Sequence, residues 1–273
     1  MTIAACYLSA EGVVFGADST TTMFVRNPDP TRGGAEHHFN YAQKIFQIGH
    51  ESCLGITMWG LGNLAATSYR TLIARFSDEL QASPQPTMAA TADRWNALFW
   101  AAYSTEYAQI LQRAQQLAGQ QQRTPDEEGE LAFLHQSFSG GFCLGGCCPP
   151  DRTPQAFEIT YSPVMTGPQA PQPLTVGSTK FWGCPNLINR LIYGVDFEIL
   201  EAIERSGKWT GTTDELVALI MPHRLAQPFD LPIREAIDWV HASIYTTIQA
   251  MKFSHLSPVC GGAVEVAVIT TDR

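Results

Sequence analysis

The sequence predicts a layered α+β domain. Apolar, β-branched runs open and close the chain, two segments with helical spacing follow the opening runs, and further strands precede a second helical block. Strands and helices grouped in this way are typical of antiparallel sheets with helices packed on their faces. No internal repeat and no long linker divides the sequence, so we expect a single domain over residues 1–273.

The first half of the chain contains strands and then helices. Residues 3–9 and 12–18 predict a β-hairpin with its turn at Gly12. The Pro- and Gly-rich residues 25–38 predict a loop. The other elements expected here are strands at 39–48 and 53–59, a helix in the stretch 60–80, and a long helix from an N-cap at Thr87 to about residue 117. That long helix carries two apolar stripes, which predict burial on more than one side.

The second half returns to strands before its helical block. The polar residues 118–130 predict a loop. Two strands follow in "FSGGFCLGGCC" and "QAFEITYS", and a short strand ends at Val176-Gly177-Ser178. The remaining elements are helices at 181–206, with an interruption or cap near Gly194, then at 212–224 and 231–252, and a closing strand in "GGAVEVAVIT".

Composition excludes several classes of function. The chain of 273 residues is 45% hydrophobic, which is enough for a sizeable core. Its net charge of -9 and the lack of a Lys/Arg cluster argue against nucleic acid or an anionic membrane as a partner. No apolar run is long enough to span a bilayer and no signal peptide opens the sequence, so we expect a cytoplasmic protein.

Cysteine usage points to thiols rather than to a metal. The seven cysteines are odd in number and lie mostly in predicted strands or helices, which favours reduced, partly buried thiols. Cys147 and Cys148 are adjacent, but no second Cys or His pair stands at ligand spacing. We therefore expect no metal and no cofactor.

Thr2 is the first residue with potential for chemistry. It directly follows Met1, and an initiator methionine before a small residue is normally trimmed, which leaves Thr2 with a free α-amine. Such an amine, with a pKa near ~8, can serve as the base for the threonine hydroxyl. The mechanism also needs a cation near the amine, an anion to orient that cation, and N–H donors for the developing oxyanion.

Three further residues match these needs. Asp18 ends an apolar strand, where a carboxylate requires a partner. Lys44 lies between apolar residues in "AQKIFQI", and Gly62 opens the first predicted helix, where a backbone N–H can face an anion. Two of them also have a plainer interpretation, since Asp18 could cap a turn and Lys44 could lie on a solvated strand face.

The opening stretch "TIAACYLSAEGVVFGADSTTT" resembles the start of proteasome β-type subunits, which begin with a nucleophilic threonine. Lys44 in "QKIFQI" and Gly62 in "GLGNLAA" are similar to the next marks of that family. "FCLGGCCPPD", "LTVGSTKF" and "VCGGAVEVAVIT" are similar to its later hairpin, turn and final strand. Without the extra N-terminal helix of α-subunits, the chain looks most like the bacterial homologues such as Anbu and its relatives.

The resemblance implies the N-terminal-nucleophile hydrolase fold, a four-layer αββα sandwich with two stacked antiparallel sheets. It implies amide hydrolysis through an acyl-enzyme ester on Thr2, with Lys44 tuning the charge and Asp18 orienting Lys44. The Gly62 N–H would supply the oxyanion hole, and Ser178 would be a second polar residue of the site. The uncharged residues that would line the substrate pocket are Thr21, Ala42, Phe46, Gly60 and Leu64. The expected partners are a peptide or unfolded protein substrate and further copies of the chain, in a ring or spiral.

Two departures keep other functions open. Ser257 and Cys260 stand where the family usually has an acidic residue and a serine. This favours the alternative of a catalytically inactive assembly or peptide-binding subunit. A third hypothesis is an amidase acting on a small molecule, because related architectures host such chemistry.

Overall fold

The two ends of the chain meet in one four-stranded antiparallel sheet. The computed structural model describes residues 2–25, 35–50, 52–225, 230–254 and 259–271. The strands of this sheet, in spatial order, are β10 (Ser178–Gly183), β1 (Ile3–Leu8), β2 (Gly12–Asp18) and β11 (Val264–Thr270). Every residue of β1 and β2 is buried. The expected hairpin is therefore confirmed, and it lies at the centre of the molecule.

A second, five-stranded antiparallel sheet faces the first. It consists of β5 (Ile45–Gln47), β6 (Leu54–Gly60), β7 (Gly140–Gly146), β8 (Gln155–Tyr161) and β9 (Gln172–Pro173), in that order. Side chains from both sheets share an apolar cluster, in which Trp59 of β6 stacks on Trp182 of β10 with ring centroids 4.4 Å apart. A separate two-stranded ribbon joins β3 (Thr21–Val25) and β4 (Ala35–Phe39).

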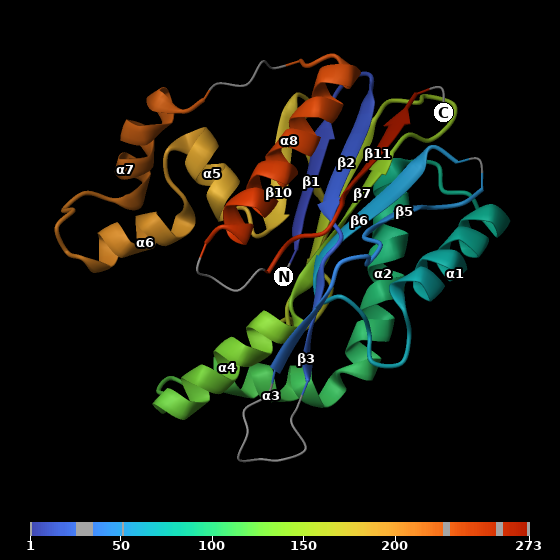
Figure 1. Ribbon diagram of the computed structural model, residues 1–273. Helices are drawn as coiled ribbons and strands as arrows, with labels where there is room; N and C mark the ends of the chain where they lie inside the picture. The colour runs from blue at the N-terminus through green and yellow to red at the C-terminus, as the bar shows by residue number, and fades with distance from the viewer. Residues whose placement is uncertain (1, 26–34, 51, 226–229, 255–258, 272–273) are drawn as a thin grey trace.

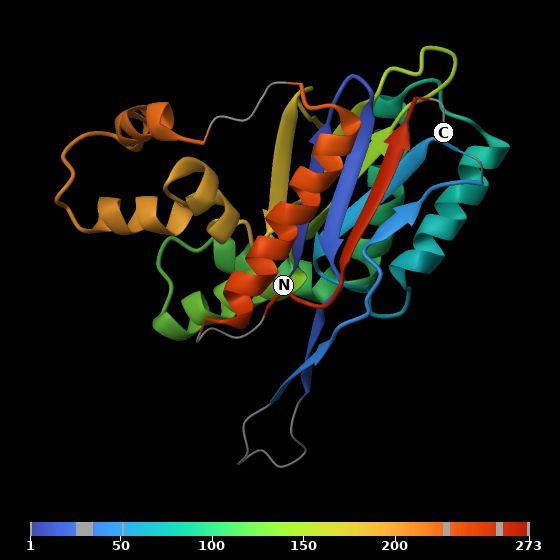
Figure 2. The same ribbon diagram turned by 45° about the horizontal axis from the view of Figure 1, so that its top comes forward.

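Helices cover the outer faces of the two large sheets (Figures 1 and 2). Helix α8 (Ile233–Lys252) packs on β1, β2 and β11. On the five-stranded sheet lie α1 (Tyr69–Ala82) and α2 (Met88–Glu106), whose aromatic side chains form the largest core cluster. Helices α3 (Ala108–Ala118) and α4 (Pro125–Phe138) pack against each other. No helix in the described part of the chain is long and apolar enough to cross a membrane.

Three short helices project sideways from the sheets and are called here the α5–α7 arm (Figures 1 and 2). They are α5 (Asn186–Tyr193), α6 (Phe197–Arg205) and α7 (Thr213–Ile220), followed by the 3-10 turn η1 (Met221–His223). Helix α5 contacts α8, whereas α6 and α7 contain no buried residue. The arm therefore adds little to the core of its own chain.

The structure confirms the mixed α+β class and corrects several element boundaries. The helix expected from residue 60 begins at Tyr69, because the Ser68 side chain caps it by accepting a hydrogen bond from Thr71 N–H. The helix expected over 87–117 breaks at Tyr107 into α2 and α3. Its second apolar stripe, which includes Trp100 and Tyr107, packs on the chain's own core.

Two stretches expected to be loops contain regular structure. Helix α4 begins inside residues 118–130, where Thr124 and Glu127 form a capping box and Pro125 occupies the first turn. The capping box and Pro125 are helix-start signals that can be recognised in the sequence, although the polar composition of residues 118–130 is typical of a loop. Val25, the first residue of the predicted loop 25–38, ends β3, and its last residues, 35–38, belong to β4, while residues 26–34 lie outside the described part of the chain.

The expected strand end at Ser178 is also wrong. Ser178 begins β10, which runs to Gly183 along β1. The helical stretch expected over 181–206 is correspondingly shorter and divides into α5 and α6. Gly194 separates these two helices with φ of 76°, which agrees with the interruption expected there.

Candidate active site

Asp18 gathers four hydrogen-bond donors around one buried carboxylate. It ends β2 beside the start of β1, and its side chain is fully buried. One oxygen, Oδ1, accepts from Ile3 N–H at 3.0 Å and from Lys44 Nζ at 2.6 Å. The other, Oδ2, accepts from Thr20 N–H at 3.2 Å and Gly261 N–H at 2.9 Å. These donors replace the water that the charge loses on burial.

Lys44 forms the cationic half of a buried ion pair. It lies just before β5 with only 3% of its surface exposed. Burial lowers the pKa of the Lys44 ammonium, and the nearby carboxylate of Asp18 opposes part of that shift. The Lys44 backbone N–H donates to Glu265 Oε2 at 3.1 Å, which ties the lysine to β11. The ion pair expected between Lys44 and Asp18 is therefore confirmed.

Thr2 lies next to this pair, immediately before β1. It is 5% exposed, and the following residue, Ile3, donates to Asp18. Across the sheet, Gly183 has φ of 83°, and a Cβ there would lie 1.8 Å from the Thr2 carbonyl oxygen. Only glycine fits this close approach without displacing the Thr2 backbone.

Two thiols lie beside Thr2 and the ion pair. The Thr2 backbone hydrogen-bonds to Cys184, the residue after β10, and burial raises the pKa of the Cys184 thiol. Burial also raises the pKa of Cys260 to about 12, with a further contribution from the negative charge of Asp18. Both thiols are therefore neutral at physiological pH. No three His, Cys, Asp or Glu side chains gather as a metal-ion site in the described residues.

Sequence reasoning noted Cys260 but missed Cys184. The available signal was positional: Cys184 directly follows the strand that pairs with β1 in the register Ile3 to Gly183. That register is decided by tertiary pairing, so the motif "VGSTKF" drew attention to Ser178 instead. Ser257, the other departure noted in the sequence, lies outside the described residues.

Ser178 does not join the site. It pairs with Leu8 at the opposite end of β1, and its hydroxyl donates to the Thr175 carbonyl oxygen. Five residue steps separate it from Gly183, which corresponds to roughly 17 Å along the strand. The expectation that Ser178 lies beside Thr2 is therefore wrong.

Gly62 lies in an irregular segment and not at a helix start. The segment joins β6 to α1, whose first residue is Tyr69, so the helix-dipole reason for choosing Gly62 does not hold. Gly62 is nonetheless exposed, and a Cβ on it would lie 3.4 Å from Thr21 Oγ1. Its backbone thus lies beside the strand that follows Asp18.

The residues expected to line a substrate pocket fall into different environments. Ala42 N–H donates to the Ser19 carbonyl oxygen at 2.8 Å, which places Ala42 close to Asp18. Phe46 is half-buried and lies beneath the Arg70 guanidinium. Leu64 is 1% exposed within the helix-side core, so the expectation that it contacts substrate is not met.

The fold is similar to that of Anbu, a bacterial proteasome-like protein. A mutant of Anbu from Hyphomicrobium sp. strain MC1 superimposes with a TM-score of 0.52 and 14% identity, covering 99% of this chain and 82% of that chain. Anbu from Yersinia bercovieri, described as an ancestral β-subunit, gives a TM-score of 0.49 and 12% identity, covering 98% and 82%. No protein-family model and no curated protein sequence matches the chain. At 14% identity, the similarity to the Hyphomicrobium protein shows the fold alone.

Proposed function

We propose that this chain is an N-terminal threonine hydrolase that cleaves amide bonds in peptides or unfolded proteins. Removal of Met1 would expose the Thr2 amine, which then acts with the Thr2 hydroxyl. The observation that carries the proposal is the buried Asp18–Lys44 pair, joined at 2.6 Å, in which Asp18 also accepts a hydrogen bond from Ile3 N–H, the residue after Thr2. Burying an ion pair costs desolvation energy that its mutual attraction only partly offsets, so such a pair beside a nucleophile is a candidate for a functional role.

In the proposed reaction the Thr2 oxygen attacks the carbonyl carbon of the substrate amide. The hydroxyl proton passes to the Thr2 amine and then to the leaving nitrogen as the C–N bond breaks. The product is an ester on Thr2. Water attacks that ester, its proton returns to the threonine oxygen, and the carboxylic acid leaves.

Lys44 and Asp18 supply the electrostatics of this sequence. The Lys44 ammonium disfavours a second positive charge on the Thr2 amine and stabilises the alkoxide that forms during attack. Asp18 fixes the position of Lys44 through the 2.6 Å contact and is itself fixed by three backbone N–H groups. Burial keeps the thiol of Cys184 neutral, so it does not add a negative charge that would favour protonation of the amine.

The proposal includes the finer architecture expected from the sequence. Helix α8 on one large sheet, the two sheets face to face, and helices α1 and α2 on the other support a four-layer αββα arrangement. The exposed Gly62 backbone beside Thr21 remains the proposed oxyanion donor. Self-association into a ring or spiral belongs to the same proposal.

A second candidate is a catalytically inactive subunit with the same fold. It is favoured by the near-complete burial of Thr2, which is 5% exposed, and by the thiols of Cys184 and Cys260 beside it. The two candidates differ in whether Thr2 reacts.

One experiment separates them. Mass analysis of the purified protein should give a chain that begins at Thr2, and a peptide epoxyketone should add to that residue. Thr2→Ala should abolish the adduct, while Thr2→Ser should retain it, since serine keeps the hydroxyl. Thr22→Ala, on β3, is the matched control and should label like the wild type. A trimmed chain that takes up no epoxyketone, or equal labelling of Thr2→Ala, would support the inactive subunit.

A further inference from the structure

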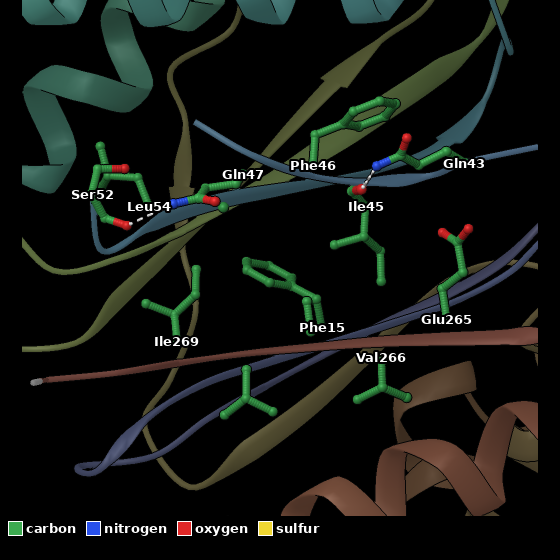
Figure 3. Close-up of a pocket in the computed structure, with 13 residues that line it drawn as sticks. Phe15, Gln43, Ile45, Phe46, Gln47, Ser52, Leu54, Glu265, Val266 and Ile269 are labelled. Carbon is green, nitrogen blue, oxygen red and sulfur yellow. Dashed lines mark hydrogen bonds between the residues drawn. The ribbon is translucent and has the colours of Figure 1, made fainter. Parts of the chain in front are cut away.

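A groove opens between the edges of the two large sheets. Within the described residues, β5 is the end strand of one sheet and β11 the end strand of the other. The N–H of Lys44, the residue before β5, donates to Glu265 Oε2 of β11 and links the two edges. Beyond that contact the space between them forms a cavity of about 480 Å³ (Figure 3). Thr2, Asp18 and Lys44 do not line it, so the groove does not contain the proposed catalytic residues, although it borders them through Glu265 and includes Phe46.

The inner surface of the groove is apolar. Figure 3 shows Ile269 on the groove side of β11, beside the ring of Phe15, and Val266 on the opposite side. Ala267 and Ile269 pack on the cluster between the sheets, whereas Val266 packs towards α8. Gly55 keeps this space open, because a Cβ there would lie 2.7 Å from Ile269 Cδ1. A ligand here would meet hydrocarbon on both sides.

The rim of the groove is polar and carries one sign of charge. The rim carries the amide of Gln43 before β5, the amide of Gln47 at its end, and the hydroxyl of Ser52 between β5 and β6. Glu265 is the one charged side chain among the lining residues. One of its oxygens accepts from Lys44 N–H, and a carboxylate has further lone pairs for a cation.

We propose that the groove binds an extended peptide segment that adds as an antiparallel strand to β11 over residues 265–269. In the described residues β11 pairs with β2 alone, so its other edge offers backbone donors and acceptors to an incoming strand. Alternate apolar side chains of the segment enter the groove beside Ala267 and Ile269. A lysine or arginine of the bound segment lies beside Glu265, which gives the carboxylate at that end of the groove a partner.

The test uses labelled peptides and the full chain. The peptide acetyl-Leu-Thr-Val-Thr-Lys-amide, with fluorescein on a flexible linker, places its Lys opposite Glu265 and its Val and Leu opposite Ala267 and Ile269 in an antiparallel pairing. We expect saturable binding by fluorescence polarisation. Replacing the peptide's Lys with Glu should weaken binding about tenfold, since like charges then meet. Glu265→Gln should abolish that preference for Lys over Glu.

Two further comparisons separate strand addition from adsorption. Ala267→Asp places a charge in the groove and should abolish binding, while Leu191→Asp, at a 57% exposed side chain on α5 that does not line the groove, should leave it unchanged. N-methylation of the peptide's alternate amides removes backbone donors and should also abolish binding, whether or not any protein variant folds poorly.

Several results would overturn the proposal. These are no saturable binding to the wild-type chain, equal affinity for the N-methylated peptide, and wild-type affinity in a folded Ala267→Asp protein. Light scattering gives one more such result. If Ala267→Asp dissociates an oligomer of the chain and the peptide does not compete with that association, a second copy of the chain occupies this edge.

Discussion

Lys44 experiences two opposing influences on its charge. Burial lowers its pKa, while the carboxylate of Asp18 at 2.6 Å raises it, and burial prevails. The carboxylate of Asp18 therefore offsets only part of the effect of burial on the Lys44 pKa. Removing either member would leave the other uncompensated, which is more costly than removing both.

We expect Lys44→Met to lower the free energy of unfolding by about 3 kcal/mol at neutral pH, because Asp18 would remain buried without its cation. The matched control is Lys180→Met. Lys180 likewise forms an ion pair with a carboxylate, that of Glu158, but its side chain is 48% exposed. Its loss should therefore lower the free energy of unfolding by less than about 1 kcal/mol. Urea unfolding followed by circular dichroism measures both values.

The pH dependence gives a second readout of the same variant. A lysine whose pKa is lowered in the folded state binds fewer protons there than in the unfolded chain, so stability rises with pH between the folded pKa and the unfolded value of about 10.4. The stability that an uncharged Lys44 contributes is fully present above the pKa of the unfolded state. It is lost as the pH falls through the lower pKa of the folded state. The stability gap between wild type and Lys44→Met should widen as pH rises through this window, and a constant gap would contradict the lowered pKa.

At the scale of elements, the ends of strands position the residues of the candidate site, and glycines at these ends allow backbone segments to approach each other closely. Gly183 ends β10 against the Thr2 carbonyl, and Gly60 ends β6 with φ of 77°. A Cβ on Gly60 would lie 2.4 Å from the Ser139 carbonyl oxygen. Gly62, two residues later, has no such contact below 3.4 Å. The two glycines therefore differ in purpose although both lie in "GLG".

Gly60→Ala should destabilise the protein by about 2 kcal/mol, because alanine meets both an unfavourable φ and a backbone oxygen. Gly62→Ala should stay within roughly 0.5 kcal/mol of wild type, as expected for an exposed position without these constraints. Thermal or urea unfolding of the two variants decides this. Equal losses would mean that the turn after β6 does not require the Gly60 conformation.

At the scale of the molecule, helices α6 and α7 of the α5–α7 arm bury no side chain in the described part of their own chain. Helices α6 and α7 have nine and eight residues and contain no buried side chain. Phe197 and Leu219, one on each helix, are 73% and 60% exposed. Helices this short are marginal without tertiary packing, so we expect other copies of the chain to cover them.

Sedimentation velocity at micromolar concentration should therefore show an oligomer. Phe197→Glu should shift the population to smaller species, since a buried charge would oppose association. Phe133→Glu is the control, because Phe133 is 59% exposed but belongs to α4, which is not part of the arm. A wild-type monomer, or the same shift for both variants, would contradict this assignment of the interface.

The sequence by itself determined the opening hairpin and the α+β class, because a turn glycine between two short β-branched runs and the grouping of strands and helices are local signals. It predicted a pairing of Asp18 with Lys44 but left a plainer interpretation of each residue open, and only the structure joined the two. Tertiary structure decided which side chains surround Thr2. The register of β10 on β1 placed Cys184 beside Thr2 and moved Ser178 to the far end, and the cap at Ser68 moved the first helix away from Gly62. A strand shifted along its neighbour keeps its local pattern, so pairing between segments some 180 residues apart depends on the packing of the whole sheet.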